Sequence, residues 1–206
     1  GDALMLAKRL REAADVYERA LVLKPDHPLA AGAACDCRQH IGDWNDHARK
    51  RQALIDGIRA GRPVCSPFVF LSLSDQPADQ QACSRLYVAE RHAGIQPALW
   101  QGERYAHRRI RVAYLSADFY HHATAYLMAE LFELHDRERF EWWGVSFGPD
   151  MHDSMRSRLE RAFDHFIDVS DRSDAEVAQQ LRELEIDIAV DLKGYTLHCR
   201  PGILAH

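Results

Sequence analysis

The sequence predicts a multidomain chain of the α plus α/β class, in which helical pairs are followed by an α/β region with a parallel sheet. In the first part, small and apolar side chains recur at spacings of three and four residues, the period of an amphipathic helix. From Ile110 onward, short apolar runs alternate with segments of helical period, which is typical of βαβ units. We therefore expect helical repeats in residues 1–62, a helical bridging segment and linker in residues 63–108, and an incomplete α/β domain in residues 109–206.

Composition excludes several classes of protein. The 206 residues carry 26 Lys and Arg against 31 Asp and Glu, a net charge of −5, which argues against a nucleic-acid binder with a basic footprint. No apolar run approaches the roughly 20 residues of a membrane span, and no secretory pattern opens the chain. Five cysteines, an odd number, fit a reducing compartment better than a disulfide framework. We expect a cytoplasmic protein that binds neither nucleic acid nor membrane.

The first helices carry a repeat pattern. Ala13 and Tyr17 lie on one helix face, and Pro25 ends that helix. A weaker second copy of this pattern contains Ala48, Gln52 and Ile55. The distance from Ala13 to Ala48 is one residue longer than the tetratricopeptide period of about 34 residues. The pattern resembles the last units of a tetratricopeptide array, in which each helix pair buries a face against its neighbour. An ordinary pair of alanine-rich amphipathic helices remains the alternative.

The bridging segment is less regular. Its prolines and the apolar run Phe68–Leu71 predict an irregular or short extended piece. A helix is expected over Pro77–Ala93, closed by Gly94 as a C-cap. The composition of Gly102–Arg109, rich in arginine and histidine, predicts a linker.

The α/β region predicts four short buried strands, each an apolar run, separated by three helices. Apolar residues spaced three and four apart define the first two helices, and Ser173 with Glu176 forms a capping box before the third. The stripes of the first two helices are Leu127, Leu131 and Leu134, and Met155, Leu159 and Ala162. The expected elements are strand Ile110–Leu115, helix Ala123–His135, strand Trp142–Phe147, helix Asp153–Phe163, strand Phe166–Val169, helix Asp174–Glu185 and strand Ile186–Leu192.

Two loops at the carboxyl ends of strands are the candidate site, because parallel sheets bind ligands at that edge. Residues 116–124 read SADFYHHAT after the first strand, and residues 191–196 read DLKGYT after the fourth. Neither loop contains the glycine pattern of dinucleotide-binding proteins, and the sequence has no phosphate-binding P-loop and no nucleophile elbow. A nicotinamide enzyme is therefore disfavoured.

His121 and His122 stand where a strand becomes a helix. Free N–H groups and the positive end of the helix dipole favour an anionic ligand there, and they favour the neutral imidazole that can accept a proton. Such a histidine could act as a base toward a hydroxyl nucleophile. In the alternative interpretation, one histidine caps the helix and the other lies in solvent.

The second loop offers an acid and a cation. Asp191 could accept hydrogen bonds from a sugar or orient a water chain, or it could simply cap the following turn. Lys193, beside Gly194, could bind a substrate or remain a solvated loop lysine. Zinc is poorly supported because His198–Cys199 is the only His/Cys dipeptide and no C-x-x-C pattern exists, so we expect no metal site.

The two loops together resemble a known family. The stretch RVAYLSADFYHHAT at residues 111–124, the later DLKGYT, and helical repeats before them are similar to the O-linked N-acetylglucosamine transferases, including bacterial homologues and SPINDLY-type relatives. The segment around Ser66 also resembles the piece that joins repeats to catalytic region in that family. Departures are Tyr120 and His121 in place of smaller residues, and Ala123 where proline is frequent.

This resemblance implies an inverting, metal-independent glycosyltransferase of the two-lobed GT-B architecture. A tetratricopeptide superhelix would precede a Rossmann-like N-terminal lobe, and a protein Ser or Thr hydroxyl would attack UDP-GlcNAc, with no cofactor besides this donor. It implies catalytic roles for His122 and Asp191, although an aspartate-linked water chain and the donor phosphate are rival bases. The substrate-binding residues it implies are Thr124, Lys193, Tyr195 and Thr196.

The resemblance also implies partners. Protein or peptide acceptors would lie along the repeat groove, and a UDP-sugar would bind mainly to a second catalytic lobe that is absent from this chain. We therefore expect the chain to be inactive without that lobe. Two alternatives stay open: another donor such as GDP-fucose, or a repeat scaffold whose catalytic lobe has degenerated into a binding protein.

Overall fold

The computed structural model describes residues 1–94 and 98–206. The chain forms two compact units, Gly1–Gly94 and Ile95–His206, and each is described by itself. The expected bridging segment, residues 63–108, is divided between them: its helices belong to the first unit and its last part to the second. No helix in the described part of the chain is long and apolar enough to cross a membrane.

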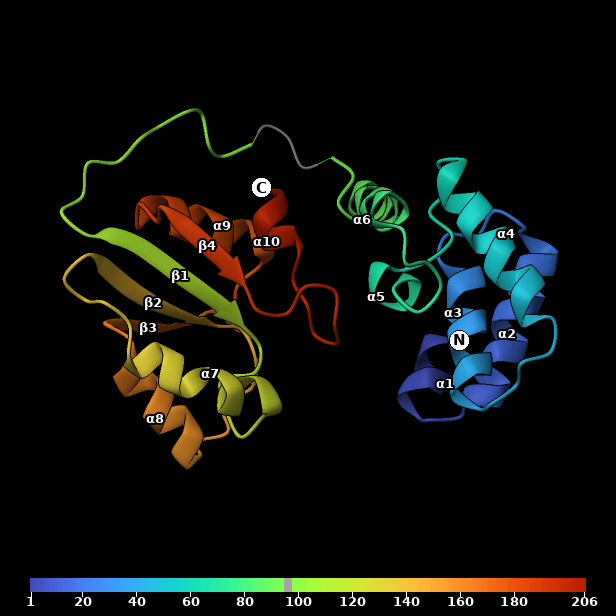
Figure 1. Ribbon diagram of the computed structural model, residues 1–206, viewed down its shortest axis with the longest axis horizontal. Helices are drawn as coiled ribbons and strands as arrows, with labels where there is room; N and C mark the ends of the chain where they lie inside the picture. The colour runs from blue at the N-terminus through green and yellow to red at the C-terminus, as the bar shows by residue number, and fades with distance from the viewer. Residues whose placement is uncertain (95–97) are drawn as a thin grey trace. The chain divides into compact units, whose positions relative to one another are not determined.

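The first unit consists of helices (Figure 1). Its alanines let neighbouring helices approach closely. Ala13 and Ala14 of one helix pack with Ala30 and Ala34 of the next in a fully buried cluster that includes Tyr17, so the predicted face is confirmed. The helices are α1 (Asp2–Leu6), α2 (Leu10–Leu23), α3 (Ala30–His40), α4 (His47–Arg59), α5 (Pro67–Phe70) and α6 (Pro77–Arg91).

Two details of this unit differ from the prediction. In α4 the buried face is formed by Leu54, Ile55 and Ile58, whereas Ala48 and Gln52 are exposed, because the larger side chains fill the cluster around Cys65 and Phe70. The run expected to be irregular or extended forms the short helix α5 instead. Proline is favoured in the first helical turn, and burial of Phe70 holds that turn in the core.

The second unit is a parallel sheet with the strand order β3-β2-β1-β4. Every strand and helix expected from the sequence is present, with ends shifted by a few residues, and a short helix α10 follows (Figure 1). The elements are β1 (Ile110–Ser116), α7 (Ala123–Glu133), β2 (Phe140–Ser146), α8 (Ser154–Ala162), β3 (His165–Asp168), α9 (Asp174–Glu183), β4 (Ile188–Asp191) and α10 (Gly202–Ala205).

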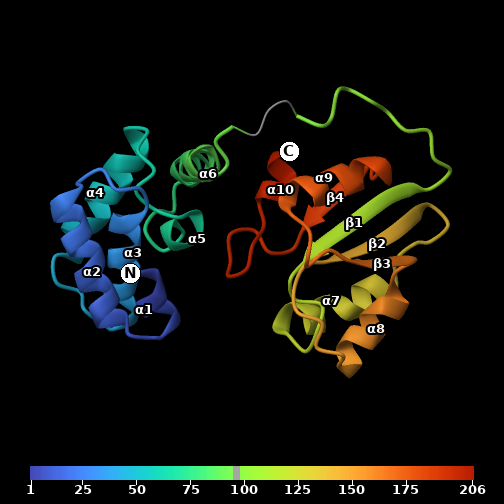
Figure 2. The same cartoon turned by 180° about the vertical axis from the view of Figure 1, so that it is seen from behind.

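Helices cover both faces of this sheet, which explains the nearly continuous apolar strands (Figure 2). Val112 and Tyr114 of β1 point into a cluster with α7 and α8. Ala113 and Leu115, which alternate with them, point into a second cluster with α9 and α10. The fold class predicted for this part is therefore confirmed.

The predicted stripe of α7 is on the wrong side of the helix. Leu127 is 82% exposed, and Leu131 and Leu134 are exposed as well. The buried side chains are Ala125, Ala129 and Phe132, which face the sheet. Small alanines bring the helix close to the strands, and Phe132 fills the space beyond them. The predicted helical period was right, but the predicted buried face was wrong.

The capping box at α9 is a local feature with a measurable effect. Ser173 Oγ accepts the N–H of Glu176, and the carboxylate of Glu176 accepts the N–H of Ser173. We expect Ser173→Ala to lower the free energy of unfolding of the second unit by about 1 kcal/mol. Urea unfolding followed by the fluorescence of Trp142 and Trp143 measures it. Ser157→Ala, inside α8 and exposed, is the matched control and should not destabilise; equal losses would contradict the assigned cap.

Candidate active site at the carboxyl edge of the sheet

The two predicted loops lie next to each other because their strands are neighbours. β1 and β4 are paired in parallel, with Leu115 in register with Asp191 at the carboxyl end. The loop of residues 117–122 therefore leaves the sheet beside the loop of residues 192–201. The topology thus brings together side chains that are far apart in the sequence.

A buried ion pair joins the two loops. Lys193 Nζ lies 2.6 Å from Asp118 Oδ2, and the two side chains are only 7% and 5% exposed. The backbone of Asp118 is held in place because its N–H donates to the hydroxyl of Ser116 at 3.0 Å. Sequence reasoning did not select Asp118. The sequence does show an aspartate just after the first strand and an isolated lysine just after the fourth. These residues point to an ion pair only once the two strands are known to be neighbours.

His122 is the N-cap of α7. Its Nδ1 accepts the N–H of Thr124 at 3.2 Å, and the same Nδ1 lies 3.5 Å from Asp118 Oδ2. The side chain is 38% exposed, so part of the ring reaches solvent. His122 and Lys193 therefore meet at one oxygen of the Asp118 carboxylate, and Thr124 contacts the His122 ring.

His121 has a different environment from its neighbour. Its Nδ1 lies 2.6 Å from the hydroxyl of Tyr126, and its Nε2 lies 3.1 Å from Ser154 Oγ. Its N–H donates to Asp153, the N-cap of α8. Desolvation raises the pKa of Asp153, but the N–H groups of His121 and Arg156 outweigh it and keep that pKa below its usual value. His121 thus ties the loop to α8 and α7 while remaining exposed at the surface.

The remaining predicted residues shape the second loop. Asp191 accepts the N–H of Lys193 at 2.8 Å, and the hydroxyl of Thr196 donates to the carbonyl of Lys193 at 2.8 Å. Gly194 has a φ of +53°, a left-handed turn that glycine adopts without strain. Tyr195 is half-buried in the same loop. Asp191 therefore caps the turn that directs Lys193 toward Asp118, and any role toward substrate is added to this one.

The described residues contain no group of three His, Cys, Asp or Glu side chains arranged to hold a metal ion. The cysteines in the described part of the chain are free thiols, and four of them are buried. Burial raises the pKa of Cys83 to about 12, and burial with the neighbouring carboxylate of Asp36 raises that of Cys37 to about 11. These thiols act as small core side chains.

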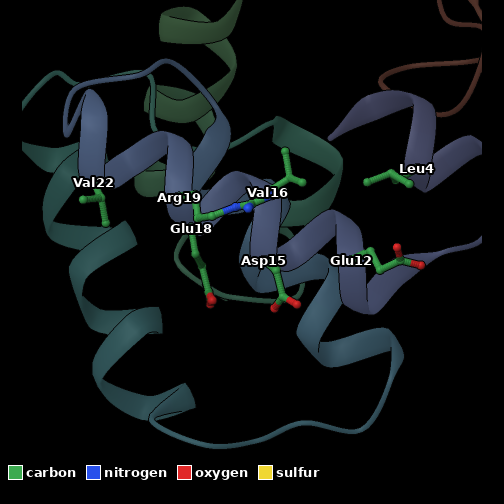
Figure 3. A pocket seen from close by; sticks show the side chains of 7 residues that line it. All are labelled: Leu4, Glu12, Asp15, Val16, Glu18, Arg19 and Val22. Atoms are coloured by element: carbon green, nitrogen blue, oxygen red, sulfur yellow. The ribbon is translucent and has the colours of Figure 1, made fainter.

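A surface pocket lies on the helical unit (Figure 3). Its acidic side chains already have partners in the same unit: Glu12 pairs with Arg9, and Asp15 and Glu18 pair with Arg38. The acids of the pocket are therefore compensated by arginines of the same unit, and they do not by themselves select a cationic ligand. The residues that line it are Leu4, Glu12, Asp15, Val16, Glu18, Arg19 and Val22.

Comparison with known proteins gives one consistent result. The glycosyl transferase family 41 profile matches residues 93–206, which include both loops. The probable UDP-N-acetylglucosamine–peptide N-acetylglucosaminyltransferase SEC of Arabidopsis thaliana is 33% identical over 98 residues, 48% of this chain and 10% of that protein. The UDP-N-acetylglucosamine–peptide N-acetylglucosaminyltransferase of Caenorhabditis elegans is 28% identical over 187 residues, 81% of this chain and 16% of that protein.

A solved structure agrees with the fold. A mutant O-GlcNAc transferase of Thermobaculum terrenum superposes with a TM-score of 0.57 at 24% identity, over 89% of this chain and 36% of that chain. The chain spans 10–16% of the length of the two curated relatives. Because the family profile matches more than half of the chain and contains the whole candidate site, the chain belongs to glycosyl transferase family 41.

Proposed function

We propose that the protein containing this chain is an inverting protein O-GlcNAc transferase, which moves N-acetylglucosamine from UDP-GlcNAc to Ser or Thr hydroxyls of proteins. The observation that carries the proposal is the capped N-terminus of α7, with His122 above a buried carboxylate, inside the region matched by the family. The activities named for the two curated relatives supply the donor and the acceptor class.

The chemistry is one displacement at the anomeric carbon. A bond forms from the acceptor oxygen to that carbon while the bond to the UDP phosphate oxygen breaks, and its electron pair leaves with UDP. The hydroxyl proton passes to a base. Because a hydroxyl is a poor nucleophile, alignment and proton transfer must supply much of the rate. In the proposed reaction no metal takes part, and the N-terminus of α7 helps to stabilise the negative charge that develops.

The proposed roles are those implied by the family motifs. His122 and Asp191 would act nearest the reacting carbon, and Thr124, Tyr195 and Thr196 would line the sugar and acceptor side. Lys193, proposed with them as a substrate-binding residue, is nearly buried against Asp118. The donor would be held largely by a second lobe, and acceptor polypeptides would bind along the helical repeats. The free buried thiols support a cytoplasmic location, where thiols stay reduced.

The test is transfer by the full-length protein. Radiolabelled UDP-GlcNAc and a panel of Ser- and Thr-containing peptides should give labelled peptide, and UDP-GlcNAc should raise the melting temperature of the protein. GDP-fucose, run in parallel, should give neither effect. Absence of both transfer and UDP-sugar binding would reject the proposal, and a response to GDP-fucose alone would reassign the donor.

A further inference from the structure

We infer that the Asp118–Lys193 ion pair is a positioning pair that decides which nitrogen of His122 carries the ring proton. It places that proton on Nε2 and makes His122 a hydrogen-bond donor toward the substrate. The geometry of this chain fixes the position of the proton, and the donation to substrate rests on the proposed function.

Nδ1 of His122 is a hydrogen-bond acceptor. A backbone N–H is always a donor, and the N–H of Thr124 lies in hydrogen-bonding geometry 3.2 Å from Nδ1. Nδ1 must then offer its lone pair. A neutral imidazole has one protonated nitrogen and one acceptor nitrogen, so the proton is on Nε2.

Asp118 competes with Thr124 for the same nitrogen of His122. Asp118 Oδ2 lies 3.5 Å from the same Nδ1, and its side chain is almost entirely buried. A carboxylate at a histidine ring nitrogen favours a proton on that nitrogen, as in catalytic pairs where an acid orients its base. Alone, Asp118 would draw the proton to Nδ1 and break the cap with Thr124.

Lys193 resolves the conflict. Its ammonium lies 2.6 Å from Oδ2, the same oxygen that faces His122, and neutralises it at closer range than the ring. Asp191 accepts the N–H of Lys193 and Thr196 donates to its carbonyl, so the backbone of Lys193 is held, and burial keeps its ammonium beside Asp118. These two residues therefore act on His122 through Lys193.

The consequence is a specific role for the exposed part of the ring. Within residues 1–94 and 98–206, Nε2 of His122 has no hydrogen-bond partner, so its N–H is free to donate to an oxygen of the acceptor or the sugar. A protonated nitrogen cannot accept the proton of the attacking hydroxyl. His122 then aligns the reacting oxygen, and another group takes the proton.

The test is ¹⁵N NMR of the imidazole nitrogens in this 206-residue chain at a pH where the ring is neutral, because the nitrogen shifts report which one is protonated. The unsubstituted chain should show the proton on Nε2. In Lys193→Met, Nδ1 should become protonated, since the released carboxylate accepts from it. Adding Asp118→Asn should return the proton to Nε2. Lys50→Met removes a lysine paired with Glu18 in the other unit and should change nothing.

Two results overturn the inference: a proton on Nδ1 in the unsubstituted chain, or no change in the Lys193 variant. A purely structural ion pair would give the second result. Lys193→Gln keeps a neutral hydrogen-bond donor beside Asp118 and replaces the methionine variant where that one does not fold. The NMR readout needs no donor or acceptor, so its failure is distinct from failure of the transfer assay.

Discussion

His122→Ala is expected to lower kcat for sugar transfer by the full-length protein by about 10²–10³-fold, the usual effect of removing one aligned donor from a reacting centre. The imidazole ring of His122 is partly exposed, and its Nδ1 accepts from Thr124, which leaves the Nε2 proton for the reacting oxygen. Alanine removes that contact. Steady-state kinetics with UDP-GlcNAc and one peptide acceptor measure it.

His122→Asn separates this effect from stability. Asparagine is a good N-cap and should keep α7 intact, yet it lacks the imidazole, so kcat should fall while the melting temperature stays near that of the unsubstituted protein. His121→Ala is the matched control, because both nitrogens of that ring are already engaged with Tyr126 and Ser154. Equal activity losses for the two alanine variants would remove the special role of His122.

Gly148→Ala is expected to destabilise the second unit by about 3 kcal/mol or more, at the upper end of overpacking effects. A Cβ at this position would lie 1.8 Å from the carbonyl oxygen of Ala117, which is main chain and cannot rotate away. Relief requires the segment after β2 to separate from the loop that leads to His122. Chemical denaturation of the second unit, followed by tryptophan fluorescence, gives the size of the loss.

The control for this substitution is Gly194→Ala. An added Cβ there meets nothing within 4 Å, and the only penalty is the left-handed backbone at φ +53°, about 1 kcal/mol. The difference between the two variants therefore measures the close approach to Ala117. If Gly148→Ala unfolds at the same denaturant concentration as the unsubstituted chain, the two backbones are not in contact in solution.

The fold was predictable because burial imposes periods that a single sequence displays. The α/β order followed from alternating periods, and the cap at Ser173 from a spacing of three residues. The phase of α7 was not predictable. Leucines and alanines both satisfy the helical period, and only the distance between helix and sheet decides that Ala125 and Ala129 face inward. A hydrophobicity argument favours Leu127, which the structure leaves exposed.

The location of the candidate site could be predicted from the sequence, but the contacts that set the state of its histidine could not. The rule that ligands meet the carboxyl edge of parallel strands selected both loops, and the start of a helix drew attention to His121 and His122 together. Only the family resemblance singled out His122. Asp118 did not follow. Its importance depends on a lysine 75 positions away, a relation that no local spacing encodes. Gly148 was missed for the same reason, because its neighbour Ala117 belongs to another strand's loop.

The strand order also has a kinetic consequence. In β3-β2-β1-β4 every neighbouring pair is parallel, so no strand pairs with its neighbour through a local hairpin, and two strands and three helices separate β1 from β4 in the sequence. Closing so long a segment is slow, because entropy is lost before the new contacts form. Until then β1, apolar on both faces, has an open edge where another chain can pair. Docking of β4 thus does two things in one event: it seals that edge and brings Lys193 to Asp118.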